Sequence, residues 1–195
     1  RWKAFARVNL ADADVMAAMA DAGCVEIRFG IESGSNRILE RTRKGFTIEE
    51  AMAVVSEAVL HFPRVDTFFI WGFPFETMED FHQTLFQMIS FRLIGARILP
   101  SLLCLLPQTD IYQEYKDKVT LEFDPTLLPE YMLTGHEVCD DGRLQASPEH
   151  QFIFDFIQEH PDLFPGFFHI DLEENIRPKF EMLREHGFYA SKDRE

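Results

Sequence analysis

One stretch of the sequence combines charged side chains with the alternation of a β-strand. In residues 24–32, CVEIRFGIE, Glu26, Arg28 and Glu32 share one face with Gly30, while the other face is wholly apolar. A strand that is covered on both faces is apolar nearly throughout. The charged face therefore meets water, internal charge partners or a ligand, and its carboxylates are suited to bind hydroxyl groups or to exchange protons.

The residues that follow this strand suit a polar ligand. Glu32 can accept hydrogen bonds from ribose hydroxyls, Ser33 can donate or accept one, and Gly34 lets a ligand approach the backbone closely. The N–H groups of the helix that follows Ser35 favour an anion such as a carboxylate. Ligands of α/β sheets bind at the carboxyl ends of strands, which favours a ligand here. An edge strand with a solvated face and an internal Glu–Arg pair remain as alternatives.

These residues must be positioned by strands that alternate with helices. Apolar alternation and capping residues predict strands at 5–9, 24–31, 65–71 and 96–105, and helices from Asp12, after Ser35, and from Thr47, Thr77 and Pro107. This alternation indicates βαβ units, a parallel sheet and an α/β fold. After about residue 120 the pattern changes, and we expect a mostly helical extension with helices starting near Ser147-Pro148 and Asp171.

Three motifs follow one another along the chain. They are FGIESGS at 29–35 with RIL at 37–39 and RKGFT at 43–47, DTFFIWGFPFETMEDF at 66–81, and LPQTDIY at 106–112. In this order they resemble the core of the radical S-adenosylmethionine (SAM) superfamily, as written in its cobalamin-binding and methylthiotransferase-like branches. The first resembles the fourth strand of that core and the helix after it, the second its fifth strand with the Gly-x-Pro-x-Glu-Thr turn, and the third the turn after its sixth strand. In the third motif Gln108 stands where the family more usually has glycine.

The resemblance implies a fold and a chemistry. The family core is a six-stranded partial TIM-like barrel, of which this chain would supply four parallel β/α units at 1–118, with 119–195 as the helical extension. The family binds a [4Fe-4S] cluster through a Cys-x3-Cys-x2-Cys loop and cleaves SAM reductively to a 5′-deoxyadenosyl radical. We find no such loop here, so the cluster ligands are expected outside this chain, in a missing N-terminal part of the same core. The parent protein is then expected to be an enzyme, and this segment alone to be inactive.

The family's cofactor contacts carry over by position. Glu32 and Ser33, with Gly34, would contact the ribose or the amino-acid portion of SAM. Ile70 and Gly72 would border the adenine, the first with an apolar side chain and the second with close backbone. The branch also includes cobalamin-binding members, so cobalamin is a further candidate cofactor of the parent protein.

Four charged residues have two interpretations each. Arg43 or Lys44 would reach the SAM carboxylate, or would belong to a solvated helix end. Arg28 and Glu26 would face the substrate inside the barrel, or Arg28 would form an internal ion pair with a neighbouring glutamate.

The composition limits the kinds of partner that this segment can bind. The net charge of −14 disfavours binding of nucleic acid through this segment. No apolar run is long enough for a membrane span. Three widely spaced cysteines (Cys24, Cys104 and Cys139) indicate neither a disulfide framework nor a metal site. We therefore expect no metal ligands in this chain and a cytoplasmic setting. As a segment, the chain would expose a sheet edge that could pair with a second copy.

Two other functions remain open. The chain could be a cluster-free binding or structural module that kept the fold and lost the chemistry. It could also belong to a (β/α)-barrel enzyme that uses Glu26 or Glu32 as an acid or base.

Overall fold

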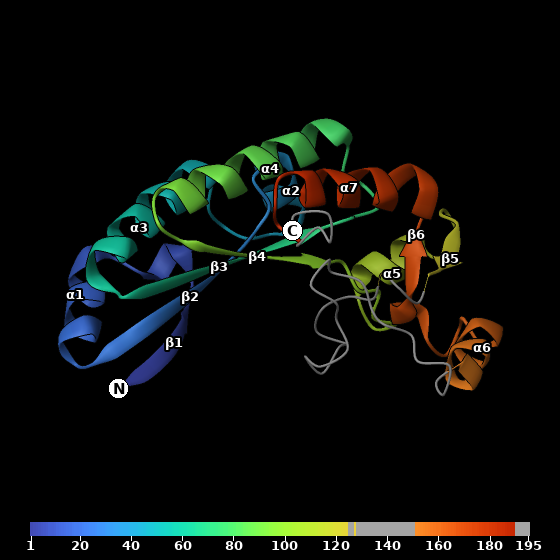
Figure 1. Cartoon of the computed structure of the whole chain (residues 1–195), viewed down its shortest axis with the longest axis horizontal. Helices are drawn as coiled ribbons and strands as arrows, with labels where there is room; N and C mark the ends of the chain where they lie inside the picture. The colour runs from blue at the N-terminus through green and yellow to red at the C-terminus, as the bar shows by residue number, and fades with distance from the viewer. Residues whose placement is uncertain (125–126, 128–150, 190–195) are drawn as a thin grey trace, which may run out of the picture. The chain divides into compact units, whose positions relative to one another are not determined.

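The computed structural model describes residues 1–124, 127 and 151–189 (Figure 1). The chain divides into two compact units, the first formed by residues 1–71 and 76–100 and the second by 72–75 together with the residues from 101 onward. The functional division expected between residues 118 and 119 stays a prediction.

The first unit is built from strands joined by helices. Its elements are β1 (Trp2–Ala6), η1 (Val8–Leu10), α1 (Ala13–Asp21), β2 (Cys24–Glu32), α2 (Asn36–Arg41), α3 (Ile48–His61), β3 (Arg64–Trp71), α4 (Met78–Leu93) and β4 (Arg97–Leu102), whose last residues belong to the second unit. The strands lie in the order β1-β2-β3-β4, and β2 is parallel to both β1 and β3. The predicted α/β class is confirmed. The first strand begins earlier than predicted, and its expected end forms the 3₁₀ turn η1.

Side-chain caps fix where the helices begin. Asp12 accepts a hydrogen bond from the backbone N–H of Val15 at 2.8 Å, as its position before α1 predicts. Thr47 and Glu50 form a capping box at the start of α3. Thr77 forms a second box with Asp80 at the start of α4.

The sheet has one helix-covered face and one face without helices. Helices α1, α3 and α4 lie along one side of it (Figure 1). Ile27, Phe29 and Ile31 share one face of β2 and are fully buried, as residues under these helices must be. Within the first unit no helix crosses the opposite face, where Phe5 of β1 is 74% exposed. The apolar and charged faces predicted for β2 are therefore the covered and uncovered faces of the sheet.

The second unit is not wholly helical. Its elements are α5 (Asp110–Tyr115), β5 (Leu121–Phe123), α6 (Gln151–Glu159), η4 (Pro165–Phe167), β6 (Phe168–Ile170), the π-helical turn η5 (Leu172–Ile176) and α7 (Arg177–Glu185). Strands β5 and β6 pair antiparallel, which the sequence pattern did not indicate. The helix start expected near Ser147-Pro148 lies outside the described residues, whereas Asp171 directly precedes η5 and α7.

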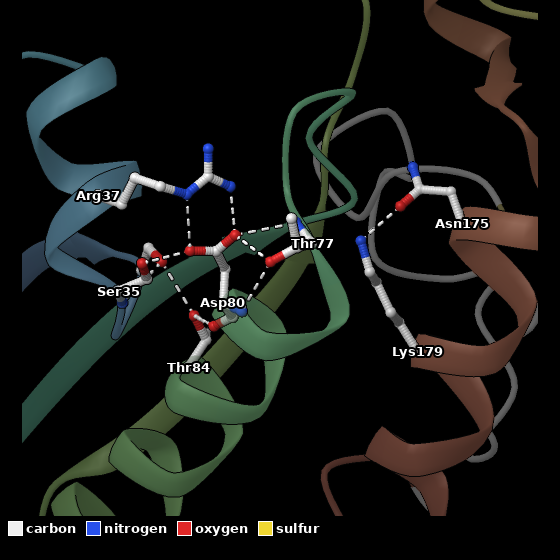
Figure 2. Close-up of polar contacts among 8 residues, drawn as sticks. Ser35, Arg37, Thr77, Asp80, Thr84, Asn175 and Lys179 are labelled. Atoms are coloured by element: carbon white, nitrogen blue, oxygen red, sulfur yellow. Dashed lines mark hydrogen bonds and ion pairs between the residues drawn. The ribbon is translucent and has the colours of Figure 1, made fainter.

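The buried lysine of this unit has an internal partner. Lys179 of α7 is almost fully buried and donates to the side-chain oxygen of Asn175, as Figure 2 shows. The amide of Asn175 donates in turn to the carbonyl of Ile170 at 3.2 Å. The pair thus connects α7 with the end of β6.

His169 of β6 is expected to make the stability of the second unit depend on pH. The ring is 2% exposed, and its Nε2–H donates to the carbonyl of Asp124 at 3.1 Å. Burial lowers the pKa of His169 below its ordinary value of 6.5. The unfolded chain therefore binds more protons just below pH 6.5, and we expect the free energy of unfolding to decrease as the pH falls through this range.

Chemical denaturation of the wild type and of His169→Gln between pH 7.5 and 5 checks this expectation. The variant should lose part of the decrease on the acid side, because glutamine does not titrate. Parallel pH profiles for the two proteins would contradict the assignment.

Every helix within the described residues is too short or too polar to span a bilayer.

Candidate functional site

The uncovered face of the sheet collects the charged residues of β2 and their neighbours. The strand register sets Lys3 of β1 beside Glu26, and Phe5 beside Arg28. On the other side it sets Arg28 beside Asp66 of β3 and Gly30 beside Phe68. Two groups of charges result, one near the amino ends of the strands and one at the carboxyl end of β2.

The group near the amino ends is an internal ion-pair network around Glu26. This carboxylate is 3% exposed, and it lies 2.7 Å from Lys3 Nζ, 2.6 Å from Arg28 Nε and 3.6 Å from Arg64 Nε. The hydrogen bond from Lys3, with further contributions from Arg28 and Arg64, holds the pKa of Glu26 below its ordinary value. A lowered pKa does not suit a general acid at neutral pH.

Arg28 belongs to the same network. Its Nε lies 3.7 Å from a carboxylate oxygen of Asp66, and its guanidinium lies over the ring of Phe5 at 5.3 Å. The internal pair with Glu26 that the sequence left open is therefore present. The predicted roles of Glu26 and Arg28 toward a substrate stay predictions.

The group at the carboxyl end of β2 is the ion pair between Glu32 and Lys44. Lys44 Nζ lies 3.1 Å from Glu32 Oε1, and the two side chains are 24% and 21% exposed. Glu32 has a left-handed backbone with φ 72°, at an irregularity in the pairing of β2 with β3. A Cβ atom on Gly30 would lie 2.6 Å from Glu32 Oε1, so the glutamate folds back over the glycine. The pair offers both an acceptor and a donor at the surface.

Of the two basic residues considered from the sequence, the structure brings Lys44 to Glu32. Lys44 also lies 5.7 Å from the ring centre of Phe46. Arg43 is exposed in the turn that follows α2, with φ 55°. The role of Arg43 toward a carboxylate stays a prediction.

Ser33 and Gly34 are packed against helix α4. Ser33 is fully buried, and its hydroxyl oxygen lies 2.9 Å from Thr84 Oγ1. The N–H of Gly34 donates to the same Thr84 oxygen at 3.0 Å, and a Cβ atom on Gly34 would lie 2.6 Å from the carbonyl oxygen of Gln83. The absent side chain of Gly34 thus makes room for the backbone of α4. Whether either residue contacts a ligand stays a prediction.

Asp80 of α4 binds the next part of the same loop, as Figure 2 shows. It accepts hydrogen bonds from Ser35 Oγ at 2.7 Å and from the backbone N–H of Thr77 at 2.9 Å, and it pairs with Arg37. Burial would raise the pKa of Asp80, but the hydrogen bonds from Arg37, Thr77 and Ser35 together outweigh burial and hold the pKa well below its ordinary value. Ser35 precedes α2 without capping it, because its hydroxyl donates to Asp80 instead.

The two residues predicted to border an adenine belong to different units. Ile70 is half-buried on β3, two residues after Phe68 and on the same face of the sheet. Gly72 belongs to the second unit and has φ 86°, and a Cβ atom there would lie 2.8 Å from Ile176 and 3.0 Å from Leu102. The adenine contacts stay predictions.

A groove of about 780 Å³ lies on the helix side of the first unit, among α2, α3 and α4. Asp80 and Arg37 line it, and they are already paired with each other. Asn36, which also lines it, donates to Glu49 at 3.0 Å. These three polar side chains of the groove therefore serve the fold.

The described cysteines are separate from each other. Cys24 is buried at the start of β2, where its thiol lies 3.4 Å from the carbonyl oxygen of Glu26. Cys104 lies in the second unit, with its sulfur 3.5 Å from the carbonyl oxygen of Gly166, and Cys139 is outside the described residues. Among the residues that the structure describes, no three His, Cys, Asp or Glu side chains gather in a way that could hold a metal ion.

Known proteins resemble this chain most clearly in its first half. The sequence model of the radical SAM superfamily matches residues 6–88. An uncharacterized methyltransferase of Pyrococcus horikoshii is 40% identical over 84 residues, which are 43% of this chain and 18% of that protein. A tRNA-2-methylthio-N(6)-dimethylallyladenosine synthase of Moorella thermoacetica is 39% identical over 67 residues, which are 33% of this chain and 15% of that enzyme.

Among solved structures, coproporphyrinogen III oxidase of Escherichia coli, described as a radical SAM enzyme, aligns with 83% of this chain and 31% of its own, at 16% identity and a TM-score of 0.48. The chain spans less than a fifth of the two curated relatives. The matched residues 6–88 include β2, the Glu32–Lys44 pair and the first turns of α4. Residues 6–88 thus match the radical SAM superfamily model, and the resemblance drawn from the sequence motifs is confirmed.

Proposed function

We propose that this chain forms part of the SAM pocket of a radical SAM enzyme, and that the uncovered face of the β1–β4 sheet is the wall that SAM contacts. The single observation that carries the proposal is the Glu32–Lys44 pair at the carboxyl end of β2, on the helix-free face and within the matched residues. Proteins of this superfamily use SAM and a [4Fe-4S] cluster. Ligands of α/β sheets bind at this end of the strands.

The donors and acceptors on this face fit the parts of SAM. The carboxylate of Glu32 accepts hydrogen bonds from ribose hydroxyls, and the ammonium group of Lys44 pairs with the SAM carboxylate. The neighbouring strand β3 contributes the apolar side chains of Phe68 and Ile70, which suit a flat adenine ring. Gly30 leaves the space above β2 to the Glu32 and Lys44 side chains, and so keeps both groups at the surface.

The described residues do not fit a cluster. Cys24 is buried within the sheet of the first unit, and Cys104 belongs to the second unit. A [4Fe-4S] cluster requires several thiolates that converge on one site. We therefore assign the cluster ligands to sequence outside the described residues. A cluster held there would supply reducing chemistry, and the residues of this chain would bind and orient SAM beside it.

The experiment is reconstitution of the full-length protein with iron and sulfide. We expect a broad visible absorbance from the cluster and release of 5′-deoxyadenosine from SAM under reducing conditions. Absence of both would contradict the proposed enzyme and would favour a cluster-free binding module.

Glu32→Gln tests the pocket itself. The amide keeps the size of the side chain and one acceptor oxygen, but it loses the negative charge that strengthens hydrogen bonds from the ribose and attracts Lys44. We expect SAM to bind about tenfold more weakly in calorimetric titrations. The matched control is Glu40→Gln, which makes the same change at an exposed residue of α2 and should leave the affinity unchanged. Equal affinity of Glu32→Gln and the wild type would remove Glu32 from the pocket.

A further inference from the structure

Helix α4 binds the loop after Glu32 with two residues that are one helical turn apart. Thr84 is fully buried and contacts Ser33 and Gly34, and Asp80 contacts Ser35. Figure 2 shows both α4 residues with their side chains directed to this loop. We call Asp80 and Thr84 the α4 clamp.

The hydrogen bonds of Thr84 determine the direction of its bond with Ser33. The Thr84 hydroxyl donates its one proton to the carbonyl of Asp80 at 3.0 Å, in the same helix. Its oxygen accepts the N–H of Gly34 at 3.0 Å. The remaining contact, at 2.9 Å, is therefore a hydrogen bond that Ser33 donates to Thr84.

With this direction, the Ser33 hydroxyl uses its proton and an acceptor site in hydrogen bonds within the fold. Its proton goes to Thr84, and its oxygen accepts the backbone N–H of Ser35 at 3.1 Å. The side chain is 0% exposed. Ser33 thus has no proton left to donate to a ligand.

The residue held by this arrangement is strained. Glu32 precedes Ser33 directly and has φ 72°, a conformation that costs a side-chain-bearing residue about 1–2 kcal/mol. Such a conformation persists only when the surrounding contacts impose it. On one side Glu32 is the last residue of β2, and on the other side the α4 clamp fixes the loop.

We propose that Thr84 is a positioning residue for Glu32, that it acts through Ser33 and Gly34, and that Ser33 holds the loop and does not itself contact SAM. The inference rests on the proposed function, because it assigns Glu32 to the SAM pocket. Thr84 keeps the Glu32 carboxylate over Gly30, where Lys44 and the ligand can reach it. Loss of the Thr84 hydroxyl lets the loop relax, and the carboxylate then leaves its place.

Thr84→Val in the full-length protein removes the hydroxyl and keeps the shape of the side chain. We expect SAM to bind about tenfold more weakly to this variant, and Thr84→Ser, which restores the hydroxyl, to bind it within about twofold of the wild type. The matched control is Ser90→Ala on the same helix. The Ser90 hydroxyl donates to the carbonyl of Phe86 at 2.9 Å, as Thr84 does to Asp80, but it lies outside the loop contacts. This control should bind SAM as the wild type does.

The decisive measurement combines Thr84→Val with Glu32→Gln. If Thr84 acts only through Glu32, Thr84→Val weakens SAM binding in the wild type and has no further effect in Glu32→Gln. An equal loss in both backgrounds, or no loss in the wild type, overturns the inference while Glu32→Gln still reports on the pocket. If Glu32→Gln itself binds SAM normally, the assignment of Glu32 to the pocket fails, and the inference fails with it.

Ser33→Ala provides a second test if Thr84→Val lowers the thermal stability too far for titration. It removes the same hydrogen bond from the loop side. Its effect on SAM affinity should likewise disappear in the Glu32→Gln background. A loss that persists in that background would make Ser33 a direct ligand and would overturn the inference.

Discussion

Gly34→Ala is expected to destabilise the first unit by about 3 kcal/mol or more, because the new side chain would meet backbone atoms. Its Cβ would lie 2.6 Å from the carbonyl oxygen of Gln83 and 2.7 Å from the Cα of Thr84. A flexible side chain could turn away from such a contact, but the backbone of α4 cannot. The helix would have to move away from the loop, and the contacts of the α4 clamp would be lost with it. Urea denaturation of the wild type and the variant measures the loss.

Gly23→Ala is the matched control. Gly23 has φ 90°, but no heavy atom lies within 4 Å of the position of its Cβ. Only backbone strain opposes alanine there, and we expect a cost of about 1 kcal/mol. Gly34 has no positive φ, so its variant reports the cost of crowding, whereas the Gly23 variant reports the cost of backbone strain. If Gly34→Ala kept full stability and lost only SAM affinity, the glycine would serve a ligand and not the packing of α4.

Asp80→Ala is expected to lower the free energy of unfolding by about 3 kcal/mol, since the carboxylate serves several groups at once. It closes the capping box of α4 with Thr77, accepts from the buried hydroxyl of Ser35 and pairs with Arg37. Alanine leaves the Ser35 hydroxyl and the Thr77 N–H without this acceptor. Removal of a buried acceptor costs more than the bond itself contributed, because its partners stay desolvated. Thermal and urea unfolding measure the change.

Glu79→Ala is the control for the cap. It removes a neighbouring, exposed carboxylate from the same first turn, and we expect less than about 0.5 kcal/mol. The pH dependence gives a second check on Asp80. Because the folded pKa of Asp80 lies below its ordinary value of 3.8, its contribution is present above that value and is lost as the pH falls through the folded pKa. Asp80→Asn should remove this part of the acid dependence, and an unchanged acid profile would contradict the assignment.

The fold of the first unit could be predicted because local signals agreed with the final contacts. The alternation in β2 identified both faces of the sheet, and Asp12, Thr47 and Thr77 identified the starts of three helices. These signals depend on neighbours within four residues. The short strands β5 and β6 were not predicted. Each has only three residues, too few to show the alternation of a strand, and they pair across more than forty residues of sequence.

The candidate site was predicted only in part. The charged face of β2 and the position of Glu32 follow from the alternation of side chains along the strand. Which of Arg43 and Lys44 reaches Glu32 depends on a turn with positive φ at Arg43, which the sequence pattern does not predict. Ser33 and Gly34 are predicted as ligand contacts because a hydroxyl and a glycine directly after a strand suit a ligand, and this prediction stays untested. The sequence does not show that α4 returns to the same place and occupies the space around them.

The α4 clamp also bears on when the proposed pocket wall forms during folding. Its bonds join residues that are 51 positions apart for Ser33 and Thr84, and 45 apart for Ser35 and Asp80. Contacts at such separations form only after the intervening chain has been ordered, here through α3 and β3. We therefore expect Glu32 to reach its strained conformation late, when α4 docks, so that a nascent or partly folded chain would not yet present the proposed SAM-binding surface.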